Sequence, residues 1–185
     1  MKFEQVVRVP RERVGVIIGR AGEEKNRLEK ELKVRLRIDS ETGDVTIGSD
    51  EVDFKEGDPF RAIEIVDAIG KGFSPFRASR LLKEEQIYTV IDLREQAKTK
   101  NSLERIKGRI IGEKGKARRV VEELTGASVS VYGHYAAIIG EEKQSKLATS
   151  AIESLASGSE HKSVYNSLQR ARTQAKLEKL KLWED

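Results

Sequence analysis

The sequence predicts an α+β protein built from two copies of one structural unit, followed by a C-terminal helix. Residues 16–22 (VIIGRAG) are echoed by residues 109–115 (RIIGEKG), which places Gly19 and Gly112 93 residues apart. The apolar positions beyond these glycines keep the same offset. Apolar residues alternate with polar ones in the expected strands and recur every three to four residues in the expected helices. Read in this way, each copy has the order strand, helix, helix, strand, strand, helix.

Six elements are expected in the first copy: a strand over residues 4–10, helices over 13–18 and 23–33, strands over 34–38 and 44–48, and a closing helix over 58–71. Pro10 ends the first strand because proline has no N–H for a ladder. Leu28 and Leu32 are spaced i,i+4 on one face of the second helix. Thr42 and Gly43 form the turn between the last two strands.

The second copy repeats this order. Its expected elements are a strand over residues 87–93, helices over 102–111 and 116–125, strands over 127–132 and 135–139, and a helix over 141–156. Gly126 suits the C-terminal stop of the second helix, and Gly133 with His134 forms the hairpin turn. A further basic helix over residues 161–183 carries Val164 and Leu168 on one stripe, which would let it dock on a domain or a partner.

The domain boundaries follow from the break between the copies. Residues 73–76 (FSPF) interrupt the chain before a short helix expected over residues 77–84. We therefore expect a first domain over residues 1–74 and a second over 75–160 that includes the short helix. The basic helix over 161–185 is expected to be separate.

Composition narrows the class of protein. The 35 Lys and Arg against 31 Asp and Glu leave a net charge of +4, which alone does not identify a polyanion partner. With no Cys and only His134 and His161, we expect no disulfide framework, no metal site and no cofactor. The sequence has no long apolar stretch, so we expect a cytoplasmic protein that does not enter a membrane.

Each Gly-x-x-Gly segment has the chemistry of a phosphate-binding loop. A chain reversal between two helices within four residues needs backbone angles that glycine adopts without a Cβ clash. Glycine also leaves the backbone bare, so a phosphodiester can approach the first amides of the following helix. There, unpaired N–H groups and the helix dipole favour negative charge. Both copies therefore predict contact with a nucleic-acid backbone.

The charge around the two loops favours the second copy. Residues 105–119 hold seven basic residues and one acid, Glu113. Residues 8–30 of the first copy hold seven basic residues against four acids, and Arg20 is the basic residue within that loop. Clustered basic residues are the electrostatic signature of nucleic-acid binding. We expect the second loop to be the stronger phosphate site.

Enzymatic alternatives fit the sequence poorly. A nucleoside-triphosphatase loop requires Gly-x-x-x-x-Gly-Lys-Ser/Thr. Lys116 does follow Gly115, but Ile110 stands where the first glycine is needed and Ala117 where a hydroxyl would bind magnesium. Neither histidine has a placed nucleophile nearby in the sequence. No catalytic residue is therefore predicted.

The glycine loops and their flanks resemble the KH domain of the eukaryotic, strand-before-helix type (type I, βααββα). In both copies a Gly-x-x-Gly preceded by Ile-Ile lies between two helices and is followed by an alternating strand and a hairpin. The resemblance implies that each unit clamps about four nucleotides of a single strand. It also implies a base-binding groove, in which one or two apolar side chains per unit meet a base while the rest are core; the candidates are Ile17, Ile18, Leu36 and Ile38, and Ile110, Ile111, Val129 and Val131.

The resemblance and the charge pattern together define the expected RNA-binding residues. In the first unit these are Ile18, Gly19, Arg20, Ala21 and Gly22. In the second unit they are Lys107, Arg109, Ile111, Gly112, Glu113, Lys114, Gly115, Lys116, Arg118 and Arg119.

Three further segments resemble the ribosome-assembly factors of the Dim/partner-of-Nob family: residues 72–82 (GFSPFRASRLL), 88–93 (YTVIDL) and 103–112 (LERIKGRIIG). This resemblance spans nearly the whole chain and implies a protein that binds the 3′ end of small-subunit (16S) rRNA during maturation. The partners it implies are the rRNA maturation endonuclease and the alpha subunit of initiation factor two. Eukaryotic members have a degenerate first glycine loop, whereas residues 19–22 are intact here, which indicates an archaeal-type member.

Two other functions are compatible with the sequence. The chain could be a KH subunit that recruits RNA to a nuclease complex, which would purify as a stable assembly. It could also be a regulator that binds single-stranded DNA, since a KH groove does not by itself select the 2′-hydroxyl. Competition between matched RNA and DNA oligonucleotides would separate RNA from DNA binding.

Overall fold

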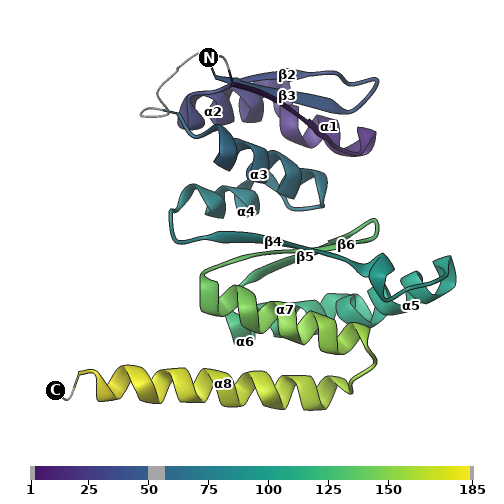
Figure 1. Ribbon diagram of the computed structural model, residues 1–185, viewed down its shortest axis with the longest axis vertical. Coiled ribbons are helices and arrows are strands. Elements are labelled where there is room, and N and C mark those ends of the chain that lie inside the picture. Colours follow the sequence, from purple (N-terminus) through teal and green to yellow (C-terminus); the bar gives the residue numbers. More distant parts are fainter. Residues whose placement is uncertain (1–2, 50–56, 184–185) are drawn as a thin grey trace. The chain divides into compact units, whose positions relative to one another are not determined.

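The computed structural model describes residues 3–49 and 57–183. The chain divides into two compact units, Met1–Glu84 and Glu85–Asp185 (Figure 1). Each unit has a three-stranded antiparallel sheet with its helices packed on one face. The order strand, helix, helix, strand, strand, helix recurs in both, which confirms the predicted α+β class.

The first unit begins with β1 (Phe3–Arg8), α1 (Arg11–Ile18) and α2 (Glu23–Leu32), and continues through β2 (Arg35–Ile38), β3 (Asp44–Ser49) and α3 (Pro59–Gly70). Its sheet has the order β1-β3-β2, because β3 pairs with both other strands. The apolar faces of the helices and strands close one core, in which the largest fully buried side chains are Ile17, Leu28, Leu36, Ile47, Ile65, Ile69, Phe73 and Leu81.

The second unit repeats this arrangement with β4 (Ile87–Asp92), α5 (Lys100–Ile111), α6 (Lys116–Thr125), β5 (Ser128–Tyr132), β6 (Tyr135–Gly140) and α7 (Glu142–Ala156). Its sheet order is β4-β6-β5. Helices α5, α6 and α7 lie on one face of this sheet (Figure 1). Their shared core includes Leu93, Ile106, Ile110, Val121, Val129, Ile138, Ile152 and Leu155.

The chain segment that follows α3 in the sequence differs from the prediction. Helix α4 (Pro75–Ala78) begins two residues earlier than expected and continues as a 3₁₀ turn over Ser79–Leu82. The Ser74 hydroxyl caps it by accepting from the Arg77 N–H, and Pro75 is pre-organised for the first helical turn. Ala78 and Leu81 are fully buried, and this segment packs on α3. It therefore belongs to the first unit and not to the second, where we had placed it.

The C-terminal helix α8 (His161–Lys181) is part of the second unit, whereas we had expected it to be separate. Its first half packs on α6 and α7 through the buried Val164 and Leu168. Residues 173–183 are exposed, and Figure 1 shows this half extending past the other helices of the unit. Within the described residues, no helix is both long and apolar enough to cross a membrane.

In each unit an arginine of the first helix binds the C-terminal end of the helix that closes the βααββα order, α3 or α7. The Arg13 guanidinium donates to the carbonyls of Ile69 (2.9 Å) and Phe73 (2.7 Å). The Arg109 guanidinium donates to the carbonyls of Leu155 (2.9 Å) and Ser159 (2.5 Å). Ile69 and Leu155 lie in the last turn of their helices, where carbonyls lack the usual i+4 partner, and the two arginines each add a hydrogen bond there.

Candidate nucleic-acid interface

The two glycine loops have nearly the same backbone. Helix α1 ends at Gly19 (φ 73°, ψ −180°), and α5 ends at Gly112 (φ 72°, ψ 175°). Their N–H groups donate to the carbonyls of Gly15 (2.9 Å) and Gly108 (2.8 Å). The third residue of each loop, Ala21 or Lys114, has a φ of 52°, and the last glycines, Gly22 and Gly115, have φ values of 79° and 75°. The sequence repeat is therefore also a repeat of backbone conformation.

The first glycine of each loop is required by close contact between two helices. A Cβ on Gly112 would lie 2.6 Å from the Ala117 Cβ and 2.7 Å from its backbone nitrogen. A Cβ on Gly19 would lie 2.6 Å from the Glu24 Cβ. These distances are far inside van der Waals contact, so a side chain here would push the second helix away from the first.

The last glycine of each loop borders open space. A Cβ on Gly115 would meet no atom closer than an Arg118 guanidinium nitrogen at 4.0 Å, and a Cβ on Gly22 would meet nothing within 4 Å. Gly115 directly precedes α6, and Gly22 directly precedes α2. A phosphate can therefore reach the start of either helix, where backbone N–H groups and the dipole favour an anion.

A partly buried carboxylate contact joins the second helix to the neighbouring strand in both units. The Glu29 carboxylate accepts from the Leu36 N–H at 2.7 Å, and the Glu122 carboxylate accepts from the Val129 N–H at 2.8 Å. Both pairs are in the same repeat register, 93 residues apart. The contact fixes the spacing between the helix and the strand that form the expected base-binding groove.

The apolar residues of this groove fall into two sets. Ile17, Leu36, Ile110 and Val129 are at most 2% exposed and belong to the core. Ile18, Ile38, Ile111 and Val131 are only partly buried. Two side chains per unit can therefore meet a base, and contact of Ile18 and Ile111 with RNA stays a prediction.

The basic residues around the second loop do not form one uniform patch. Lys114 and Lys116 are exposed, next to the exposed Glu113, and the Arg119 guanidinium donates to the Lys114 carbonyl (3.0 Å). These side chains surround the start of α6. They are the charges best placed for a phosphate at Gly115.

Three other predicted RNA-binding cations have partners within the protein. Arg109 holds the end of α7, as described above. Arg118 pairs with the Glu122 carboxylate at 3.0 Å and donates to the Val129 carbonyl at 3.3 Å. The Lys107 ammonium lies 3.5 Å from the Glu104 carboxylate. These contacts position the loop and groove, so any contact of these three cations with RNA stays a prediction.

The first loop has less positive charge on the same backbone. Arg20 is exposed, but α2 begins with Glu23 and Glu24, where α6 begins with Lys116 and Ala117. Arg27 pairs with Glu24 and Glu31, and its pKa is raised mainly by the hydrogen bond that its guanidinium donates to the Glu24 carboxylate. Carboxylates in the first turn already occupy the favourable field of the helix dipole, so a phosphate gains less there.

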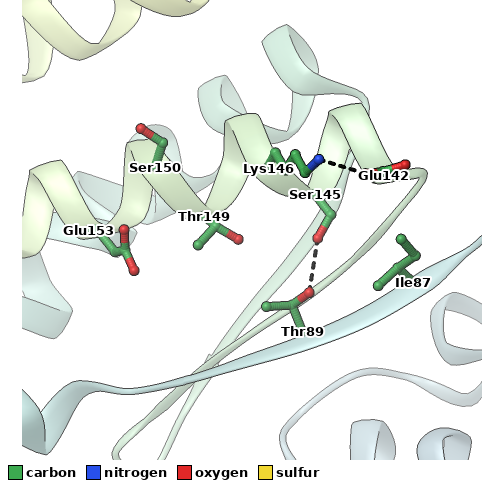
Figure 2. Close-up of a pocket in the computed structure, with 8 residues that line it drawn as sticks. All are labelled: Ile87, Thr89, Glu142, Ser145, Lys146, Thr149, Ser150 and Glu153. Atoms are coloured by element: carbon green, nitrogen blue, oxygen red, sulfur yellow. Dashed lines mark hydrogen bonds and ion pairs between the residues drawn. The ribbon is translucent and has the colours of Figure 1, made fainter.

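A hollow of about 460 Å³ between edge strand β4 and α7 does not fit an anion (Figure 2). Thr89 and Ser145 hydrogen-bond across it at 3.0 Å, and Lys146 pairs with Glu142 at 2.6 Å. Glu153 adds a second carboxylate, so the hollow has a net negative charge. The glycine loops are the better candidates for phosphate.

Two repeated Gly-x-x-Gly loops on the βααββα fold define a KH-type nucleic-acid-binding protein. Family models agree: residues 87–173 match the eukaryotic type KH-domain (KH-domain type I), and residues 4–56 match the KH domain. The chain belongs to the archaeal Dim2p/PNO1-type family of RNA-binding proteins with two KH domains.

Relatives cover nearly the whole chain. A KH domain-containing protein of Methanocaldococcus jannaschii is 44% identical over 99% of this chain and 80% of its own length. Dim2p from Pyrococcus horikoshii is 47% identical, with 91% of this chain and 99% of that chain covered and a TM-score of 0.83. A protein of unknown function from Aeropyrum pernix is 39% identical over 100% and 98% of the two chains, with a TM-score of 0.90.

A further solved structure contains a relative with bound molecules. It is the a/eIF2alpha–aDim2p–rRNA complex from Pyrococcus horikoshii, and the matching chain is 46% identical, with 94% of this chain and 96% of that chain covered and a TM-score of 0.86.

Sequence analysis missed three residues that lie beside the second loop. Gly108, His161 and Tyr165 border a hollow that also reaches Gly112 and Lys116. One signal was available: Gly15 and Gly108 share a repeat register in the middle of a helix, where glycine is unfavourable. The aromatic residues gave no signal because α8 is outside the repeat.

The two glycines of the second loop should differ in their effect on stability. Gly112→Ala should lower the free energy of unfolding by about 3 kcal/mol, because the residue would be strained at this φ and ψ and its Cβ would clash. Gly115→Ala, with open space around it, should cost about 1 kcal/mol for the left-handed conformation alone. Urea unfolding followed by circular dichroism measures both. Equal losses would contradict a packing role for Gly112.

Lys114 and Lys116 should account for much of the salt dependence of RNA binding. Replacing both with alanine should flatten the slope of log affinity against log salt by about 1.4, since each phosphate contact on a single strand contributes about 0.7. Replacing Lys98 and Lys143, which are exposed elsewhere in the second unit, is the matched control. An unchanged slope in the loop variant would place these lysines away from the phosphates.

Proposed function

We propose that this protein binds the 3′ end of small-subunit rRNA as a single strand during ribosome assembly, with the loop of residues 112–115 as the main phosphate site. The observation that carries the proposal is the open outer side of Gly115, at the start of a helix and beside Lys114 and Lys116. Backbone amides there bind phosphate without reading sequence, while the adjoining groove meets the bases.

The relatives support RNA as the ligand. The Pyrococcus horikoshii aDim2p, 46% identical to this chain, was crystallised with rRNA and a/eIF2alpha. The intact loop supports the same ligand for this chain, because its two glycines have the positive φ values that the Gly-x-x-Gly turn needs. Because the same crystal structure of the relative contains a/eIF2alpha, we propose the alpha subunit of initiation factor two as a protein partner of this chain.

The two units have different shares in this function. The second loop combines an open helix start with exposed lysines, whereas the first is followed by Glu23 and Glu24. We therefore assign the main affinity to the second unit. The first unit contributes a weaker contact with the same strand.

Substituting the last glycine of each loop tests the assignment. Gly115→Asp places a carboxylate where the phosphate is expected, in space that accepts a side chain, so RNA affinity should fall at least about tenfold. Gly115→Asn is the matched control, because it has the same shape without the charge and should lose less. Gly22→Asp should also cost less than Gly115→Asp. If the Asp variants remain folded by circular dichroism and bind RNA as the wild type does, the loops are only structural turns.

The target is tested with three RNAs of equal length. A single strand matching the mature 3′ end of small-subunit rRNA should bind at least about tenfold more tightly than a scrambled strand of the same composition, because the groove contacts unpaired base edges. Annealing the matching strand to its complement should remove most of that affinity, since pairing hides the base edges but keeps the phosphates. Equal binding of all three RNAs would contradict the ribosomal assignment. A single-stranded DNA of the matching sequence is the fourth ligand, and tighter binding of this DNA than of the RNA would indicate a DNA-binding protein.

A further inference from the structure

A hollow of about 500 Å³ lies beside the second glycine loop, on the side of α5 that faces α8. Gly112 and Lys116 of the loop region line it, together with Arg105 and Gly108 of α5 and His161 and Tyr165 of α8. Its volume is within the range of small-ligand sites. Because two of its residues also border the phosphate site, a strand that leaves the loop on this side enters the hollow directly.

One wall of the hollow is bare helix backbone. Gly108 is exposed in the last part of α5, and a Cβ there would meet nothing within 4 Å. Glycine inside a helix costs about 1 kcal/mol relative to alanine, and no contact within the described residues explains that cost. Glycine at this position gives a ligand close access to the helix.

The opposite wall has two aromatic rings in fixed positions. His161 and Tyr165 lie with ring centroids 6.0 Å apart and planes at 66°. The His161 Nε2 hydrogen-bonds the Arg109 carbonyl at 2.8 Å, and the Arg109 guanidinium in turn donates to the Ser159 carbonyl just before α8. Both rings are only partly buried, and burial raises the pKa of the Tyr165 hydroxyl. A partly exposed, immobilised aromatic ring is a stacking surface for a nucleobase.

The charges of the hollow suit a phosphate. Arg105 and Lys116 are both exposed, and Glu113 is the one acid that lines the hollow. In the first unit the residues at the same repeat positions are Glu12 and Glu23, and α3 is followed by the short helix α4 where α7 is followed by the long α8. This combination of basic and aromatic side chains is therefore specific to the second unit.

We propose that this hollow binds a nucleotide of single-stranded RNA that flanks the four held by the glycine loop. The base packs on Tyr165 and His161, and the phosphate lies near Arg105 and Lys116. The inference rests on the proposed function and extends the RNA site of the second unit from the KH groove onto the C-terminal helix.

RNAs of two lengths test the inference. A four-nucleotide RNA taken from the mature rRNA 3′ end is compared with RNAs extended by two nucleotides at the 5′ or the 3′ end. In the wild type, one of the two extensions should raise affinity about tenfold, in keeping with the stacking of one base on an aromatic ring. In the double variant Arg105→Ala/Tyr165→Leu this gain should fall below about twofold, while binding of the four-nucleotide RNA stays at the wild-type value.

A matched control and a direct readout accompany this comparison. Lys143→Ala removes an exposed cation from α7, away from the hollow, and should keep the full gain. A 4-thiouridine in the flanking position should crosslink to the peptide that contains Tyr165. Arg105→Ala alone, a change of an exposed side chain, should lower the gain while the thermal unfolding midpoint is unchanged.

The possible failures are distinguishable. If the wild type binds the four-nucleotide RNA but gains nothing from either extension, or if the double variant keeps the full gain, the hollow is not a nucleotide site. If the wild type does not bind the four-nucleotide RNA and Gly115→Asp does not weaken its binding of longer RNA, the proposed function itself is wrong.

Discussion

The close approach of two helices at one glycine is the constraint on which each unit depends. At Gly19 and Gly112 the backbone lies so near the following helix that a Cβ would come within 2.6 Å of it. This approach forces the chain to reverse within four residues and places the last glycine of the loop at an open helix start. The Glu29 and Glu122 carboxylates then fix the distance to the neighbouring strand. Loop and groove are therefore set by the same packing.

The two glycine loops have the same backbone conformation but are followed by side chains of opposite charge. Their loop dihedrals agree within a few degrees, yet the second helix begins with Glu23 and Glu24 in one unit and with Lys116 and Ala117 in the other. Because contacts to phosphate contribute much of the affinity for a nucleic acid, we expect the charge at the helix start to set how strongly each unit holds the strand. The second unit also has α8, which adds an aromatic wall beside its loop.

The sequence predicted the fold well because the repeat gives the two copies of the βααββα order the same register of apolar residues and glycine loops. It placed the start of α4 wrongly, since the Ser74 cap and Pro75 together begin a helix where residues 73–76 were expected to interrupt the chain. It also predicted Arg109 and Arg118 as RNA-binding cations without their contacts inside the protein. The backbone carbonyls that these two arginines bind lie on other elements, which only the folded chain brings near, so charge counting could not show these contacts. The hollow at α8 was missed because α8 lies outside the repeat.

Amide chemical shifts test most directly whether the second loop holds the RNA backbone. The ¹⁵N-labelled full-length protein would be titrated with a single strand matching the mature 3′ end of small-subunit rRNA. We expect the largest changes at the amides of residues 112–117, smaller ones at residues 19–24, and a dependence on salt at both. Unchanged signals at residues 112–117, with the largest changes confined to the exposed half of α8 or to the β4 edge, would contradict phosphate binding by the glycine loop.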